Sequence, residues 1–301
     1  MHCVRLLIML IIAAGCSRAE QAEELRFEVS GRLEDSKIRE ASGLARSHNQ
    51  PNLMWIINDH GAKEFLHAID HSGAKLGRFK LKKSKNKDWE DLASFKFNDE
   101  AYLMVADIGD NDAKRAHRTL YFVQEPGLEQ EPEVTTDWKV RYQYPNGPRD
   151  AESSAIDTRK QQVLILSKRD LPPQLFSVPL QSESETMITA EKLGVITSLP
   201  RPSRQDVEYA AKTKDRYWRP VGMDISEDNL AAVILTYRAV FYFERATEQS
   251  WIEALNAEPV RISLGNFKNA EAIAFGDDKR VVFVTGENKH SRLLRIDLGE
   301  R

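Results

Sequence analysis

Short apolar segments separated by turn residues run along most of the chain, and in many of them apolar and polar residues alternate as in β-strands. The segments come in groups of four, and most groups begin with acidic residues. Long stretches of helical periodicity are absent after the first 16 residues. The pattern predicts an all-β fold built from a repeated unit of four antiparallel strands.

Five units can be counted from their first strands. These strands are EASGLA (40–45), DWEDLASFKF (88–97), DAESSAID (150–157), VGMDIS (221–226) and NAEAIAF (269–275). The starts lie roughly 40 to 70 residues apart, within reach of the blade spacing of β-propellers. Residues 199–219 are interpreted as an excursion between two blades; if they form strands, the count becomes six.

The two ends of the chain indicate a closed ring. The last unit stops one strand short, and residues 25–33 are a predicted strand with no unit of its own. Pairing this strand with residues 291–298 would complete the last blade and remove two exposed sheet edges. A β-sandwich or two small barrels are the alternatives, and the missing fourth strand favours a β-propeller.

Acidic residues recur in the first strands, which line the central channel of a propeller. Alignment of the units pairs Glu40 and Ser42 with Asp88 and Glu90, Asp150 and Glu152, Arg219 and Val221, and Asn269 and Glu271. Carboxylates that converge in a narrow channel raise one another's pKa, so either protons or a cation must enter. Oxygen ligands without a histidine or cysteine cluster favour calcium, with an acidic, water-filled channel as the alternative. Asp224 falls on the opposite parity to Val221 and would face the channel only with a bulge.

A second ring of charges is predicted at the ends of the second strands. Its members are Asp59, Asp107, Lys168, Arg238 and Glu287. These strand ends should meet at one mouth of the channel, where mixed charges indicate a small anionic ligand, and Asp107, Lys168 and Arg238 are the candidate catalytic residues. The alternative is that Lys168 and Arg238 only form ion pairs with Glu152 or Asp107.

The N-terminus is predicted to be an export signal. It has one arginine, an apolar run at residues 6–12 that is too short for a stable membrane span, and small residues before Cys16. Residues 13–16, AAGC, resemble the lipobox of bacterial lipoproteins. This predicts a signal peptide at 1–15, a lipid on Cys16, a linker at 16–24 and one propeller domain at 25–301. An ordinary signal peptide or an uncut anchor is the alternative.

Cysteine content and charge narrow the compartment and the partners. Cys3 and Cys16 are the only cysteines, so the predicted domain has no disulfide. Lipidation predicts the bacterial cell envelope, and Ser17 favours the outer membrane, facing the periplasm, in a Gram-negative cell. The formal net charge is −3 with acids and bases interspersed, which excludes a basic nucleic-acid-binding face.

The motifs and their order resemble a family of secreted bacterial propellers related to the esterase-like phytase and lactonase propellers. The matching stretches between residues 40 and 275 are EASGL, NDHG, DWEDLA, ADIGDN, YPNGPRDAE, VGMDIS and EAIAF. The metal-lined centre that the resemblance implies comprises Glu40, Glu90, Asp150, Glu152 and Glu271, and the implied mouth comprises Asp59, Asp107, Asp110 and Asn111. His60 stands where the family often has a serine, so this chain has no hydroxyl at that position.

Two functions from different classes follow. The first is a lipid-anchored hydrolase that uses a channel calcium on a phosphate or carboxylate ester. A phytase-like site would hold several calcium ions and phosphates, whereas a lactonase-like site would hold one metal; only two basic residues at the predicted mouth argue against a highly phosphorylated substrate. No Gly-x-Ser-x-Gly or His-Glu-x-x-His motif supports other hydrolase chemistry. The second function is a non-catalytic scaffold that binds a protein or an envelope glycan, with a purely structural calcium.

Overall fold

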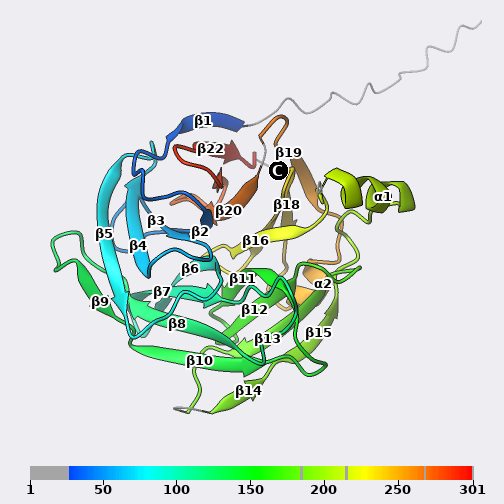
Figure 1. Ribbon diagram of the computed structural model, residues 1–301, viewed down its shortest axis with the longest axis horizontal. Helices are drawn as coiled ribbons and strands as arrows, with labels where there is room; N and C mark the ends of the chain where they lie inside the picture. The colour runs from blue at the N-terminus through cyan, green and yellow to red at the C-terminus, as the bar shows by residue number, and fades with distance from the viewer. Residues whose placement is uncertain (1–26, 184–185, 214–215, 268, 300–301) are drawn as a thin grey trace, which may run out of the picture.

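The computed structural model describes residues 27–183, 186–213, 216–267 and 269–299. Within these residues five sheets stand around a central axis, so the predicted all-β propeller and its five blades are confirmed (Figure 1). The predicted signal peptide at 1–15, the predicted lipidation site Cys16 and the predicted linker at 16–24 lie outside the described residues. Among the helices that the structure describes, none is long and apolar enough to cross a membrane.

The blades follow one another along the chain. Blade one contains β2 (Ala41–Arg46), β3 (Leu53–Asn58), β4 (Phe65–Asp70), β5 (Lys75–Lys82) and β9 (Glu133–Thr135). Blade two contains β6 (Trp89–Phe97), β7 (Glu100–Asp107), β8 (Arg118–Gln124), β10 (Trp138–Gln143) and β14 (Met187–Thr189). Blade three contains β11 (Ala151–Asp157), β12 (Gln162–Ser167), β13 (Gln174–Pro179) and β15 (Glu191–Val195). Blade four contains β16 (Pro220–Ile225), β17 (Ala231–Thr236), β18 (Ala239–Glu244) and β19 (Val260–Ser263).

Blade five closes the ring with strands from both ends of the chain. It contains β20 (Ala270–Phe275), β21 (Val281–Gly286), β22 (Arg292–Asp297) and β1 (Phe27–Arg32). β1 runs antiparallel to β22, as the unpaired N-terminal strand predicted, and it supplies the missing fourth strand. The first strands β2, β6, β11, β16 and β20 contact one another in a closed circle around the channel (Figure 1).

Four elements differ from the sequence-based prediction, namely β9, β14 and two helices. β9 pairs in parallel with β5 and adds an outer strand to blade one, although it lies between two strands of blade two in the chain. β14 pairs in parallel with β10 and adds an outer strand to blade two, although it lies between two strands of blade three. Each has only three residues, too few for alternation to reveal. The excursion at 199–219 contains a helix, α1 (Arg204–Thr213), rather than strands, which leaves five blades. A second, one-turn helix, α2 (Trp251–Ala254), precedes β19.

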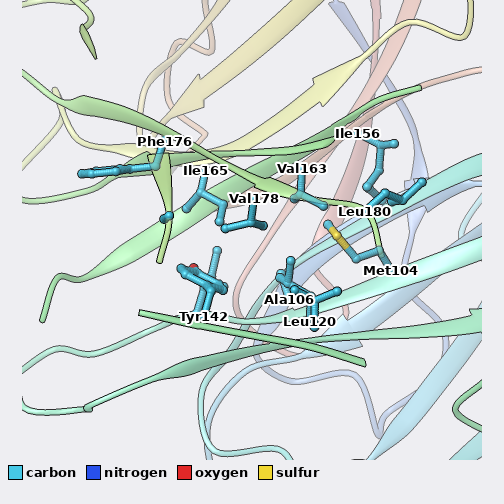
Figure 2. Packing of buried hydrophobic residues seen from close by; sticks show 14 of the residues in the cluster. Met104, Ala106, Leu120, Tyr142, Ile156, Val163, Ile165, Phe176, Val178 and Leu180 are labelled. Atoms are coloured by element: carbon cyan, nitrogen blue, oxygen red, sulfur yellow. The ribbon is translucent and has the colours of Figure 1, made fainter. Parts of the chain in front are cut away.

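The hydrophobic core lies between neighbouring blades. Five clusters of buried residues fill the five interfaces. Figure 2 shows one of them, where Met104, Leu120 and Tyr142 of blade two face Ile165 and Val178 of blade three. Burial of each such side chain contributes about 1.5–3 kcal/mol. Because every first strand is packed on both sides, the polar residues at its start are held in fixed positions around the channel.

Candidate functional site

Each first strand contains a β-bulge at the same place. The pairing register shifts by one residue between Trp89 and Asp91 opposite β7, and equivalent shifts occur in the other four blades. The five bulged residues are Ser42, Glu90, Glu152, Val221 and Glu271. A bulge leaves its residue outside the strand pairing and redirects the side chain. The five positions that alternation aligned in the sequence are therefore equivalent in the structure and form one ring around the channel.

A cavity of about 730 Å³ opens at this end of the channel, and all five blades line it. Its acidic residues are Asp59, Glu90, Glu152, Glu271 and Glu287, and its basic residues are Lys168, Arg216 and Arg238. Tyr237 and Asn269 add polar groups, and Tyr209 and Thr213 extend the lining to α1. Of the predicted metal residues, Glu90, Glu152 and Glu271 line this cavity.

Three carboxylates approach closely on the side of blades one and two. One oxygen each from Asp59, Asp88 and Glu90 can be chosen so that all three lie within 4.8 Å of one another. Trp89, between Asp88 and Glu90, is buried and donates from its indole nitrogen to the carbonyl of Lys85 at 3.1 Å. The acid-rich stretch DWEDLA thus anchors its tryptophan in the core and presents the flanking carboxylates to the mouth.

The loops that carry these carboxylates are fixed to each other by Asn86. Its side-chain nitrogen donates to the carbonyl oxygens of Asn58 and Asp59 at 3.1 and 3.0 Å, and its side-chain oxygen accepts from the backbone N–H of Trp89 at 3.1 Å. One amide therefore connects the end of β3 to the start of β6. Asp59 and Asp88 keep their separation because of this connection.

Gly109 provides the space that the carboxylates occupy. A Cβ atom built at this position would lie 2.2 Å from Glu90 Oε1 and 2.5 Å from Asp88 Oδ2. The Gly109 N–H donates to the backbone carbonyl of Asp88 at 3.2 Å, which keeps the glycine against that residue. Any side chain at position 109 would displace the two carboxylates.

Burial and mutual repulsion raise the pKa of several acids in this region. Burial, followed by the neighbouring charge of Asp59, raises the pKa of Asp88 to about 6. Burial and the charges of Glu152 and Asp59 raise the pKa of Glu90 well above its usual value. The pKa of Asp59 is also raised, by burial first. A bound cation would relieve this repulsion, because it favours the charged carboxylates.

Lys168 and Glu152 form an ion pair on the neighbouring blade three. The Lys168 ammonium donates to Glu152 Oε1, while Glu152 Oε2 is buried with no hydrogen-bond partner among the described residues. Burial raises the pKa of Glu152 to about 7 in spite of Lys168. Burial alone would lower the pKa of Lys168, but the charges of Glu152 and Glu271 raise it, so the ammonium stays charged.

The predicted second ring is in register in three blades and shifted by one residue in two. In each blade, the first-strand residue just before the bulge pairs with a residue at the end of the second strand. The next residue in the chain is Asp59 in blade one, Lys168 in blade three and Glu287 in blade five. The equivalent residue is Tyr237 in blade four and Ile108 in blade two, rather than Arg238 and Asp107. The shift is hidden in the sequence because a charged residue lies one position away from the equivalent place in both blades.

The two shifted residues have different surroundings. Arg238 lines the cavity, and its guanidinium lies 5.9 Å from the ring centre of Tyr217. Asp107 is buried, forms an ion pair with Arg115 at 2.7 Å and accepts from the backbone N–H of Asp88 at 3.1 Å. Asp107 is not part of the cavity lining, so it touches the site only through Asp88.

The other predicted residues lie around the rim. Asp150 is buried, binds the Arg169 side chain and accepts from the backbone N–H of Asp110 at 2.9 Å. Asp110 in turn forms an ion pair with Arg118 at 2.6 Å. Asn111 lines the cavity, whereas Glu40 is exposed and borders a neighbouring pocket on blade one.

Basic residues that the prediction omitted gather beside Lys168 on blades three and four. The pKa of Arg219 is lowered by burial and then by the positive charges of Arg169 and Arg216, so both of these charges lie near enough to act on Arg219. The alignment of the first strands places Arg219 opposite Asp150, and this was the sequence feature that could have predicted a basic residue at the mouth. The mouth holds more than the two basic residues expected, and this removes the sequence-based argument against a multiply charged ligand.

Further along the channel, two carboxylates join neighbouring blades. Asp91 accepts from the backbone N–H of Ser154 at 2.6 Å, and Asp224 accepts from that of Phe275 at 2.9 Å. The bulge of blade four is at Val221, so Asp224 is not turned to the mouth. Burial raises the pKa of Asp224 to about 7. These two acids connect strands and contribute no group to the cavity lining.

Comparison with known proteins gives no family assignment. No family model matches the chain, and no curated protein gives a significant match. Among solved structures, hydrazine synthase from Kuenenia stuttgartiensis is similar with a TM-score of 0.43 and 8% identity, over 86% of this chain and 72% of that one. The assignment as a β-propeller rests on the ring of five sheets, and the resemblance to phytase and lactonase propellers stays a prediction.

Proposed function

We propose that the channel mouth is a calcium-dependent hydrolytic site for phosphate or carboxylate esters. The observation that carries the proposal is the meeting of Asp59, Asp88 and Glu90, with oxygens within 4.8 Å, in a region whose adjoining cavity also contains Lys168 and Arg238. Such a site requires carboxylates that bind the cation and basic groups that bind the anionic substrate. The mouth contains carboxylates of raised pKa and guanidinium groups.

The residues fit a calcium ion. Calcium binds six to eight oxygen ligands in flexible geometry, and three carboxylates offer up to about six oxygens. Gly109 leaves room for them, and Glu152, whose buried Oε2 has no hydrogen-bond partner among the described residues, belongs to the cavity lining. When bound, the ion would act as a Lewis acid on a carbonyl or phosphoryl oxygen.

The protein residues would bind and orient the substrate. Lys168 and Arg238, with Arg169, Arg216 and Arg219 close by, would hold the anionic group, since guanidinium groups bind carboxylates and phosphates in a bidentate manner. Asp107 would act as a positioning residue, because it accepts from the backbone N–H of Asp88 and does not line the cavity.

The test is a screen of p-nitrophenyl phosphate, bis-p-nitrophenyl phosphate, p-nitrophenyl acetate and a lactone, with calcium or with chelator. We expect hydrolysis of at least one ester with calcium and none with chelator. Arg238→Gln should lower kcat/KM about tenfold or more, the loss of roughly 1.4 kcal/mol of transition-state binding. Arg261→Gln, an exposed position on β19, is the matched control and should have no effect. Calcium binding without hydrolysis of any substrate would contradict the enzymatic proposal.

A structural calcium in a non-catalytic scaffold is the second candidate. It is favoured by Asp91 and Asp224, which already join neighbouring blades through buried carboxylates. A calcium between Asp59 of blade one and Glu90 of blade two would join blades in the same way. In that case removal of calcium should lower the melting temperature, while Arg238→Gln should change neither calcium binding nor stability.

We also propose that a lipid on Cys16 anchors the protein in the cell envelope. The support is the sequence AAGC at 13–16 behind an apolar run. Metabolic labelling with a fatty acid should mark the wild type and not Cys16→Ser. Equal labelling of the two proteins would contradict the anchor.

A further inference from the structure

A second pocket, separate from the channel cavity, lies on blade one. It has a volume of about 600 Å³ and is lined by the turn before β2, the end of β3, the β3–β4 loop, β4 and β5. Its charged residues are Lys37, Arg39, Lys63 and Arg78, with Glu40 as the only acid. Four basic residues against one acid give it a local charge of 4 − 1 = +3 with its histidines neutral.

The positive charge of this pocket is not neutralised by the protein. Among the described residues, Lys37, Arg39, Lys63 and Arg78 form no ion pair with a carboxylate. By contrast, guanidinium groups on blades two and three are paired: Arg115 with Asp107, Arg118 with Asp110, Arg149 with Asp170 and Arg169 with Asp150. Uncompensated cations that gather around a hollow attract an anion.

The walls of the pocket are held in place by hydrogen bonds. The side-chain oxygen of Asn58 accepts from the backbone N–H groups of Arg39 and Glu40 at 2.9 and 3.1 Å. Its side-chain nitrogen donates to the carbonyl of Lys37 at 3.1 Å. One buried amide therefore fixes the turn that carries two of the four cations, which lowers the cost of ordering them around a ligand.

The floor and the opposite wall are equally defined. His67 is buried and lies 3.1 Å from Asp35 through its Nδ1, and burial lowers its pKa, so the ring stays neutral at neutral pH. Arg78 projects from β5 and lies 4.3 Å from the ring centre of Phe65. This stacking orients the guanidinium, because a cation is attracted to the face of an aromatic ring.

We propose that this pocket binds a small anion that carries two or more carboxylate or phosphate groups. The volume is that of a pocket for a whole small molecule rather than for one oxyanion. Four cations on three separate segments, the turn before β2, the β3–β4 loop and β5, call for more than one negative group. The site is independent of calcium, because its cations do not belong to the carboxylate cluster of Asp59, Asp88 and Glu90.

The test is calorimetric titration of the full protein with pyrophosphate and with citrate, in chelator so that no divalent cation takes part. Both probes carry several negative charges, one as phosphate and the other as carboxylate. We expect at least one to bind, and the preferred probe identifies the chemistry. Binding should weaken as salt rises from about 50 to about 300 mM, since salt screens exposed charges.

Variants locate the binding. Lys63→Gln with Arg78→Gln, and separately Lys37→Gln with Arg39→Gln, should each weaken binding at least tenfold while the melting temperature stays within a few degrees. Lys192→Gln with Arg261→Gln removes the same charge from exposed positions elsewhere and should have no effect. Arg238→Gln, in the channel mouth, separates the two sites, because binding at the blade-one pocket is the part that both pocket variants lose and Arg238→Gln keeps. The proposal is overturned if the wild type binds neither probe, or if Arg238→Gln loses binding while both pocket variants keep it.

Discussion

Asp88 and Glu90 stand on either side of the buried Trp89, and their carboxylates meet that of Asp59 at the channel mouth. Period-two alternation identified Glu90, Glu152 and Glu271 because the bulge occurs at the same place in each first strand. It could not show that Asp88 joins Asp59, because that contact depends on how Asn86 connects two loops. Local pattern predicts which face a strand residue takes, whereas contacts between loops require the fold.

Because the pKa of Asp88 is raised, replacing its carboxylate should stabilise the folded protein by an amount that depends on pH. Because the pKa is about 6 in the folded protein against an ordinary 3.8, the unfolded chain releases this proton first as pH rises. Stability is therefore lost between about pH 4 and pH 6 and stays lower above that range. In chelator, Asp88→Asn should raise the free energy of unfolding at pH 8 by at most about 3 kcal/mol and barely change it at pH 4.

Urea denaturation at the two pH values checks this prediction. Asp278→Asn is a suitable control, because its pKa is lowered by Arg280 and its removal should not stabilise the protein at pH 8. Equal effects of Asp88→Asn at pH 4 and pH 8 would show that the Asp88 carboxylate is not destabilised by its surroundings.

A substitution at Gly109 should weaken calcium binding with little effect on folding. In Gly109→Ala the methyl group would meet the ends of two side chains, Glu90 and Asp88, which can move without disturbing the backbone. We expect calcium affinity to fall at least tenfold, while the melting temperature falls by only a few degrees. Gly127→Ala, whose Cβ would meet nothing nearer than 3.8 Å, is the control and should leave calcium binding unchanged. Unchanged calcium affinity in Gly109→Ala would place the ion elsewhere.

At the scale of elements, alternation and turn residues predicted the four main strands of blades one to four, and the three strands of blade five with its closing N-terminal strand. They missed β9 and β14, because three residues show no periodicity and their parallel partners lie more than 40 residues away in the chain. They also missed α1. Ala210 is the only buried residue of this helix, so no apolar stripe marks it in the sequence.

The closing strand β1 should be essential for stability. Its register runs from Phe27 opposite Ile296 to Arg32 opposite Arg292, and its loss would expose the whole edge of β22. Deletion of residues 27–32 should lower the melting temperature by roughly 10 °C or more, since about 1 kcal/mol shifts the midpoint of a domain of this size by 2–4 °C. Differential scanning calorimetry measures this. An unchanged midpoint would mean that β22 does not need its partner.

At the scale of the whole molecule, the ring brings together residues that are far apart in the sequence. It places Asp59, Asp88 and Glu90 near Glu271, more than 180 residues later, and it gathers Arg169, Arg216 and Arg219 at the mouth. The ring of acids was predictable from the repeat. The basic residues at the mouth were not all predictable, because they come from strand ends and from the connection between blades three and four.

The central claim is that the acids of the mouth hold calcium, and calorimetric titration of calcium into the metal-free protein tests it most directly. The wild type should bind calcium and gain about 2.7 kcal/mol of stability when free calcium is a hundredfold above Kd. Glu90→Gln should bind at least tenfold more weakly, and Glu191→Gln, an exposed position on β15, should bind like the wild type. The account is contradicted if the wild type takes up no calcium and Glu90→Gln is the more stable protein with or without the ion, since the mouth would then be an acidic, water-filled channel.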